Sequence, residues 1–315
     1  MGQFRQNLTA FNAQSFSFGR HETFHLRYGW LTKGCKSLMQ DAQVFQRDDS
    51  TVTLGVGKNM VTSIRYWLIA TRMAYISNEG LALTELGHAI FSNDGWDTFL
   101  EDEATIWLIH WLLATNSEHA TSIYWFFNKF HKVEFSSDEL HSSLSEFVAQ
   151  ELSGKKVADT TLRHDCNMLT RLYMRSMADK KTSIEDALDS PLAMLELIGA
   201  SSSNHRYISK PSARWDLPLG VLGFAVAELF QLAGQASLAL EAIVHGSNDL
   251  PALGSVFRIS EENLMTKLEQ LISWSPETIE LRETAGVNAL YLLKHVDPIS
   301  MLEKHYSTFC MDVAA

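Results

Sequence analysis

The stretch that decides the fold covers residues 53–73 and reads TLGVGKNMVTSIRYWLIATRM. Two glycines precede Lys58, and from that residue on the apolar positions recur with helical spacing, at about 100° of rotation per residue. The apolar stripe contains Met60, Val61, Ile64, Trp67 and Leu68, and a second stripe, roughly 120° away, contains Lys58, Thr62, Arg65 and Arg72. We therefore expect a helix over residues 58–73 that buries one face and leaves the other basic.

The segments on either side of this helix extend the pattern. Before it, residues 47–51 are polar and offer helix caps, which predicts another helix ahead of the glycines. After it, residues 73–83 are typical of a hairpin with its turn at 77–80, and Thr84 begins a further helix. Helix, turn, helix and hairpin is the order of a winged helix-turn-helix, so we predict a DNA-binding domain over residues 1–92.

The rest of the chain, residues 93–315, has a helical period almost everywhere. Residues 104–114 are apolar nearly all round and should lie at the centre of the fold, as should the aromatic residues Trp107, Trp111, Trp125, Phe126 and Phe127. Ser275-Pro-Glu predicts a helix start, and the polar stretch 201–216 is the best candidate for a loop between two helical halves. The predicted fold class is mainly α: a winged helix-turn-helix domain followed by an all-α helical domain.

Composition and charge narrow the class of protein. The chain has 315 residues, of which 46% are hydrophobic and only 6 are Pro, which is typical of an ordered protein long enough for two domains. Its formal net charge of -11 is unevenly spread. Residues 1–92 hold nine Lys and Arg against six Asp and Glu (+3), whereas residues 93–315 hold seventeen against thirty-one (-14). The acidic body would repel DNA and orient the basic N-terminal domain toward it.

Neither a membrane nor an oxidising compartment is indicated. No apolar run reaches the ~18 residues of a membrane span, and the start, MGQFRQNLTAF, is unlike a secretory signal. Cys35, Cys166 and Cys310 have no C-x-x-C spacing, so we expect buried thiols rather than disulfides or a thiolate zinc site. We expect a cytoplasmic protein.

One short pattern, His21-Glu-Thr-Phe-His25, matches the H-E-x-x-H signature of zinc hydrolases. That chemistry requires both histidines on one helix, one turn apart. Gly19, Gly29 and the alternating flanks instead favour a strand or a loop. A zinc hydrolase is therefore a rival hypothesis, which predicts zinc that is lost when either histidine is replaced.

A second pattern, Gly55-Val-Gly-Lys-Asn59, resembles the end of a phosphate-binding loop. It fails as a Walker A motif because Val52 stands where a Gly is needed and Asn59 stands where a Ser or Thr is needed. The glycines are better explained by a tight turn between two helices, which leaves backbone N–H groups and Lys58 at a helix N-terminus to seat a DNA phosphate. The alternative is that Lys58, Arg65 and Arg72 are an ordinary solvated helix face.

Two polar clusters could carry chemistry. The acidic cluster Asp94, Asp97, Glu101, Asp102 and Glu103 could seat Mg²⁺, but such runs more often complement the positive end of a helix. The other cluster is His21, Glu22 and Arg27, which lie among aromatic residues in a half-buried stretch. Because buried charges need partners, this cluster is either a structural ion pair such as Arg27 with Glu22, or a functional site.

Longer motifs resemble one family of bacterial proteins. The N-terminal motifs are His21-Glu22-x-Phe24-x-x-Arg27-x-Gly29-Trp30-Leu31-x-Lys33-Gly34, Leu54-Gly-Val-Gly-Lys-Asn-Met-Val61, Ile64-Arg-Tyr-Trp67 and Leu83-Thr-x-Leu-Gly87. Further matches are Glu101-Asp-x-Ala-Thr-x-Trp107-Leu-x-His110-Trp111, Trp125-x-Phe127-Asn128, Thr161-Leu-x-x-Asp165 and Gly254-x-Val-Phe257-x-Ile259. Over nearly the whole chain they resemble the SspB-like family, long described as a domain of unknown function and encoded beside cysteine desulfurase and sulfur-transfer genes of DNA phosphorothioation systems.

The resemblance implies a DNA-nicking endonuclease of phosphorothioate modification and anti-phage defence, which cuts one strand so that sulfur can replace a non-bridging phosphate oxygen. Carried over by position, His21 or Glu22 would be the general base and Arg27 would bind phosphate; His25 lies outside the family pattern. The residues expected to contact DNA are Lys33, Lys58, Asn59, Thr62, Arg65 and Arg72.

The implied cofactor is a divalent ion, Mg²⁺ or Mn²⁺, with no organic cofactor. The implied partners are DNA and the sulfur-transfer proteins of the same gene cluster, a cysteine desulfurase and ATP-dependent enzymes. A homodimer is expected because helix-turn-helix proteins often bind paired half-sites. The alternative function is a non-catalytic DNA-binding or adaptor subunit, which would bind DNA without cutting it.

Overall fold

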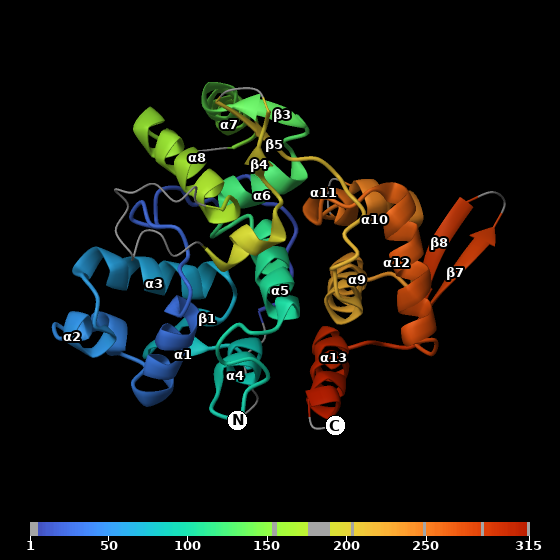
Figure 1. The fold of residues 1–315 in the computed structure, drawn as a ribbon, viewed down its shortest axis with the longest axis horizontal. Helices are drawn as coiled ribbons and strands as arrows, with labels where there is room; N and C mark the ends of the chain where they lie inside the picture. The colour runs from blue at the N-terminus through green and yellow to red at the C-terminus, as the bar shows by residue number, and fades with distance from the viewer. Residues whose placement is uncertain are drawn as a thin grey trace. The chain divides into compact units, whose positions relative to one another are not determined.

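The computed structural model of the chain divides into two compact units, one of residues 1–6 and 12–210 and the other of residues 7–11 and 211–315 (Figure 1). The residues described are 6–152, 156–175, 190–202, 205–247, 250–284 and 287–313. The boundary after Lys210 falls inside the stretch 201–216, which confirms this stretch as the connection between two halves. The predicted division after residue 92 lies within the first unit and remains a prediction.

The first unit begins with the predicted order of helix, turn, helix and hairpin. The helices are α1 (Trp30–Gln40), the 3-10 turn η1 (Val44–Gln46), α2 (Ser50–Leu54) and α3 (Lys58–Ala70). Gly55 ends α2 with φ 62°, a left-handed conformation that glycine adopts without strain. Strands β1 (Ala74–Ser77) and β2 (Gly80–Leu83) pair antiparallel around the turn, and α4 (Glu85–Phe91) follows.

Two details explain how the hairpin is fixed to the helices around it. Helix α3 ends at Ala70, three residues earlier than predicted, because Arg72 adopts a left-handed φ of 57°. The Thr84 side chain accepts a hydrogen bond from the Gly87 N–H and so caps α4. A Cβ at Gly87 would collide with the Met73 carbonyl, so only glycine lets α4 approach the start of β1.

The second part of this unit is helical around an aromatic core. It contains α5 (Glu103–Ala114), α6 (Thr121–Asn128), α7 (Ser137–Glu151), α8 (Asp159–Tyr173) and the 3-10 helix η2 (Pro191–Leu195). Every residue of α5 from Ala104 to Ala114 is buried, as predicted from its apolar circumference. The five predicted aromatic core residues are all buried as well. A small antiparallel sheet completes the unit, in the order β3 (Glu134–Ser136), β5 (Arg206–Ile208), β4 (Gly199–Ala200).

The second unit combines helices with a three-stranded antiparallel sheet. Its helices are α9 (Leu219–Ala233), α10 (Leu240–His245), α11 (Leu253–Val256), α12 (Glu261–Trp274) and α13 (Pro298–Val313), and α9 packs on both α12 and α13. The sheet has the order β6 (Ser237–Ala239), β8 (Val287–Leu292), β7 (Ile279–Thr284).

The helix predicted at Ser275-Pro-Glu is wrong. Ser275 is the C-cap of α12, and the hairpin of β7 and β8 follows. The residues of β7 alternate between apolar and charged positions, Ile279-Glu-Leu-Arg, which is the two-residue period of a strand. Over the described residues the fold is mainly α with three small sheets, rather than all-α after residue 92.

Two further expectations concern membranes and thiols. None of the described helices is long and apolar enough to cross a bilayer. Cys35 and Cys166 are buried free thiols, as expected, and burial raises the pKa of Cys166 to about 12. The side chain of Cys310 lies outside the described residues.

Candidate functional site

The loop of residues 18–23 enters the site as a series of turns. Gly19, Glu22 and Thr23 all have positive φ, of 69°, 49° and 65°. Left-handed conformations at non-glycine residues cost energy and often mark functional sites. Because residues 21–25 are not helical, His21 and His25 are not held one helical turn apart, and the expectation of a loop at this pattern is confirmed.

His21 is buried against an acidic residue that lies 144 positions away in the sequence. Its Nε2 lies 2.9 Å from Oδ1 of Asp165 on α8, and the two side chains are 1% and 2% exposed. The Gly19 N–H donates to the same Oδ1 at 2.8 Å. Since a carboxylate accepts, the proton between them belongs on Nε2. In the neutral imidazole Nδ1 is then the lone-pair acceptor, and this buried atom has no hydrogen-bond partner.

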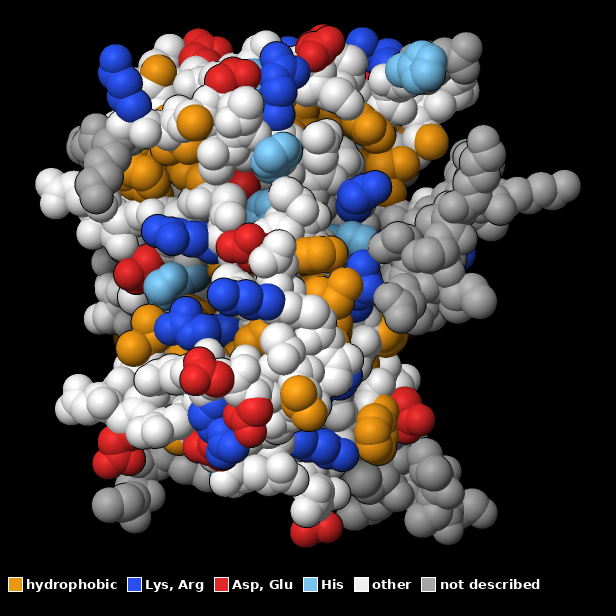
Figure 2. Space-filling model, turned by 90° about the vertical axis from the view of Figure 1, so that its left-hand side faces the viewer, with side chains coloured by type: hydrophobic (Ala, Val, Ile, Leu, Met, Phe, Trp, Pro, Cys, Tyr) orange, Lys and Arg blue, Asp and Glu red, His pale blue; other side chains and the backbone are white. Residues whose placement is uncertain are grey.

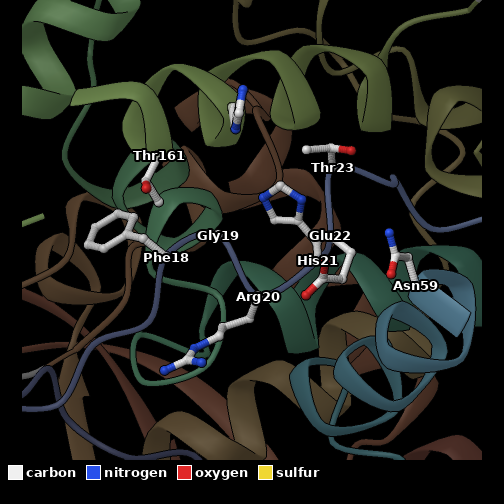
Figure 3. A pocket seen from close by; sticks show the side chains of 9 residues that line it. Phe18, Gly19, Arg20, His21, Glu22, Thr23, Asn59 and Thr161 are labelled. Atoms are coloured by element: carbon white, nitrogen blue, oxygen red, sulfur yellow. The ribbon is translucent and has the colours of Figure 1, made fainter. Parts of the chain in front are cut away.

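A pocket of about 430 Å³ opens beside this pair. Figure 3 shows His21 and Glu22 at its centre, with Thr161 of α8 on one side and Asn59 of α3 on the other. The remaining lining residues are Phe18, Gly19, Arg20, Thr23 and His164. The pocket therefore joins the predicted catalytic cluster to the first turn of the helix predicted to bind DNA.

Tyr66 of α3 packs against the buried pair of His21 and Asp165. Its ring lies edge-on to His21, with the ring centroids 6.1 Å apart. Burial, and after it the negative charge of Asp165, raise the pKa of Tyr66 well above its usual range. The phenol therefore stays neutral.

The three predicted catalytic residues do not share one place. His21 and Glu22 both line the pocket, and Glu22 is exposed. Arg27 does not line it: its guanidinium lies over the rings of Phe24 and Trp30, 5.6 and 5.5 Å from their centroids. The cation that the pocket does hold is the exposed Arg20, which extends away from the imidazole in Figure 3.

Four of the six predicted DNA-binding residues lie on one face of α3. Lys58, Asn59 and Thr62 are exposed and Arg65 is half-buried, whereas the opposite side of the helix is buried. Gly57 at the N-cap of this 13-residue helix has no side chain that could accept a hydrogen bond. The first backbone N–H groups of α3 therefore have no capping partner. Lys33 is exposed on α1, and its Nζ donates to the Leu54 carbonyl at the end of α2.

The prediction that Arg72 belongs to the basic stripe of α3 is wrong. It lies beyond the end of α3, is 4% exposed, and donates to Oγ1 of Thr115 at 2.8 Å. A buried guanidinium committed to an internal contact cannot reach a phosphate. The helix would have had to continue to residue 73 for Arg72 to join Lys58 and Arg65, and the left-handed turn prevents this.

The surface around the pocket carries both signs of charge. Figure 2 shows the side of the molecule where α2, α3 and α8 lie, with Lys, Arg and His side chains across its middle and Asp and Glu side chains among them. Such a surface attracts phosphates locally without the strong field of a uniformly basic face.

The acidic cluster after α4 has the structural role expected of it. Asp102 caps α5 by accepting from the Ala104 N–H, and the buried Asp97 accepts from the N–H groups of Glu101 and Asp102 and from the Thr105 hydroxyl. Within the described residues, no three or more His, Cys, Asp or Glu side chains converge as a metal site.

The shared oxygen of Asp165 leads to a stability prediction. Asp165→Ala leaves His21 Nε2 and the Gly19 N–H buried without an acceptor, so the free energy of unfolding should fall by about 2–4 kcal/mol. Asp165→Asn keeps Oδ1, which accepts both hydrogen bonds, and should cost clearly less. Urea unfolding followed by circular dichroism measures both. Equal losses would show that the shared oxygen is not what holds the loop.

Comparisons with known proteins identify a matching family and two similar solved structures. Residues 18–306 match a family described as a protein of unknown function, DUF4007. Two solved structures of SspB, one described as magnesium ion-bound, align with TM-scores of 0.82 and 0.81 at 25% sequence identity. Each alignment covers 94% of this chain and 90% of the other. No curated protein matches the sequence.

Proposed function

The chain belongs to the DUF4007 family and shares the fold of SspB, and from this premise we propose that it nicks one strand of DNA for phosphorothioate modification in anti-phage defence. The observation that supports this most is the composition of the pocket. A buried histidine with an unpartnered nitrogen and an exposed carboxylate lie beside the N-terminal turn of α3. The proposed catalytic groups and the proposed DNA-binding helix therefore line the same pocket.

The proposed reaction is hydrolysis of a phosphodiester. His21 Nδ1 takes a proton from the attacking water as its oxygen bonds to phosphorus. The bond from phosphorus to the leaving sugar oxygen breaks, and a second water from solvent donates a proton to that oxygen. Asp165 holds Nε2–H and so presents Nδ1 as the acceptor, which is the role of the acidic residue in a His–Asp pair. Arg20 contacts a neighbouring phosphate in place of Arg27, which lies outside the pocket.

A divalent ion belongs to this proposal. Glu22 and Asn59 place a carboxylate and an amide oxygen on the pocket wall. Mg²⁺ keeps several waters and binds through one or two carboxylates together with phosphate oxygens, so this donor set fits hydrated Mg²⁺ or Mn²⁺ held jointly with DNA. When bound, the ion would offset the charge that develops on the phosphate. No organic cofactor is part of the proposal.

DNA would be bound in the manner of a winged helix-turn-helix. The N-terminal turn of α3 and the side chains of Lys58, Thr62 and Arg65 would contact phosphates and the groove, with the β1–β2 hairpin as the wing. The sulfur-transfer proteins, a cysteine desulfurase and ATP-dependent enzymes, would act at the nick. A homodimer would present two such helices to paired half-sites.

The test of this proposal is conversion of supercoiled plasmid to open circle by purified protein, with Mg²⁺, Mn²⁺ and EDTA in parallel. We expect open circle to accumulate with either metal and not with EDTA. A protein that shifts the plasmid in a binding assay but leaves it supercoiled under all conditions would be a non-catalytic recognition or adaptor subunit.

Removing two cations from α3 should weaken binding in a salt-dependent way. We expect Lys58→Ala/Arg65→Ala to lower the affinity for duplex DNA by at least about tenfold at low salt, because phosphate contacts dominate such affinity. The slope of log affinity against log salt should shrink by about 2, one for each lost contact. Fluorescence anisotropy measures both the affinity and the salt slope.

The control Arg171→Ala/Arg175→Ala removes the same charge from exposed residues outside α3. If the two double variants lost affinity equally, α3 would have no specific role in binding DNA.

A further inference from the structure

A second pocket, of about 420 Å³, lies on the exposed side of α1. It is lined by residues one helical turn apart, Gly29, Thr32, Lys33, Lys36, Ser37 and Gln40, and by Phe99 from the loop before α5. Lys33 is exposed and Lys36 is half-buried. The pocket thus combines two ammonium groups, small polar side chains and one aromatic ring.

Phe99 is presented to solvent by a loop that is anchored on both sides. Its side chain is 64% exposed, whereas Asp97 before it and Leu100 after it are buried. The Thr32 hydroxyl donates to the Thr98 carbonyl at 2.6 Å, which fixes this loop to α1. The Lys36 ammonium lies 4.6 Å from the centre of the Phe99 ring. The ammonium therefore covers one face of the ring, and a planar group would stack on the other face of this fixed, largely exposed side chain.

The pocket is adjacent to the proposed DNA-binding turn. Lys33 lines the pocket, and its Nζ lies 2.9 Å from the Leu54 carbonyl, immediately before the Gly55–Gly57 turn that leads into α3. A nucleic-acid strand leaving the first turn of α3 would therefore reach Lys33 and then Lys36.

We propose that this pocket binds an unpaired nucleotide of single-stranded DNA, with the base stacked on Phe99 and its phosphates on Lys33 and Lys36. An aromatic ring can stack on a base only when that base is free of its duplex neighbours, and cation-flanked rings are how sequence-tolerant single-strand sites are built. The inference rests on the proposed DNA binding but not on nicking. In a nicking protein, the pocket would hold the strand that comes loose beside the cut.

The test compares single-stranded and duplex DNA in fluorescence anisotropy. The probes are an end-labelled poly-dT oligonucleotide and a blunt duplex of the same length. We expect Phe99→Ala to weaken single-strand binding about 5- to 150-fold, because stacking on one ring is worth about 1–3 kcal/mol. Duplex binding should change less than about twofold, and Phe99→Trp should preserve both affinities.

The control variant is Trp215→Ala, which removes an aromatic side chain of the same 64% exposure from the second unit. Unchanged single-strand affinity in Phe99→Ala would overturn the proposal, and this is also the result expected if the pocket instead held an acidic peptide. An equal loss for duplex and single strand would overturn it too, because it would indicate a backbone contact rather than stacking. If the wild-type protein bound neither probe, the proposed DNA-binding function would be wrong. If it bound and nicked the duplex but did not bind poly-dT, the proposed function would stand and only the single-strand pocket would be wrong.

Discussion

Glu22→Ala is expected to lower the rate of plasmid nicking by at least about 100-fold while DNA binding is kept. Glu22 is exposed on a turn, so its loss should not disturb folding, and it is the carboxylate that lines the pocket. Removing a negative charge that faces DNA should leave the affinity equal or slightly tighter. Nicking at saturating protein, measured together with anisotropy, separates the two effects.

The matched control for this variant is Glu146→Ala. Glu146 is an exposed carboxylate on α7 that does not line the pocket, and its loss should leave the nicking rate unchanged. If Glu22→Ala nicked as fast as the wild type, the pocket would lose its proposed metal-holding group, and the divalent ion would have to bind elsewhere.

The second large effect is expected for His21→Ala. Loss of the general base should reduce nicking by about 10²- to 10⁴-fold. The substitution also removes the partner of Asp165, so reduced stability could lower activity by itself. Adding imidazole to the reaction distinguishes these causes, because the space left by the side chain adjoins an open pocket of about 430 Å³.

Imidazole should restore part of the nicking rate of His21→Ala and have no effect on Glu22→Ala. A purely structural role for His21 would give a variant whose unfolding midpoint is lowered and whose nicking imidazole does not rescue. That result would leave the base unassigned and would favour Glu22, the other residue considered for this role.

The local structure near α3 could be predicted because it depends on nearby residues. The apolar spacing of Val61, Ile64 and Trp67 defines the buried face of α3, and the Gly55–Gly57 turn and the Thr84 cap mark where helices end and begin. The hairpin over residues 74–83 likewise follows from a two-residue turn between apolar strands. These features need no information from the rest of the chain.

The candidate site was predicted only in part, because its contacts span long distances in the sequence. His21 and Glu22 stood out as polar residues among aromatic ones, but nothing near them identifies Asp165 as the buried partner. The only signal for Asp165 was its place in a motif shared with the SspB-like family. Arg20 could have been noticed as the cation next to His21, whereas its preference over Arg27 depends on how the loop turns.

The wrong predictions at the ends of α3 and α12 also arise because contacts distant in sequence act there. Periodicity predicts that α3 continues to residue 73, with Arg72 on its basic face. Arg72 instead adopts a left-handed conformation, and its side chain donates to Thr115, the C-cap of α5. At Ser275, the serine followed by proline is typical of a helix start, whereas the alternating residues after it form the strand β7. Tertiary contacts thus override local preference where a helix ends.

Nicking by this chain is tested by the single-turnover nicking rate of DNA-saturated protein, compared among wild type, Glu22→Ala and Lys58→Ala/Arg65→Ala. We expect the wild type to nick and Glu22→Ala to bind without nicking. The double variant should nick at close to the wild-type rate once enough protein saturates the DNA. Wild-type protein that saturates the plasmid in Mg²⁺ and leaves it supercoiled would show that a partner does the cutting.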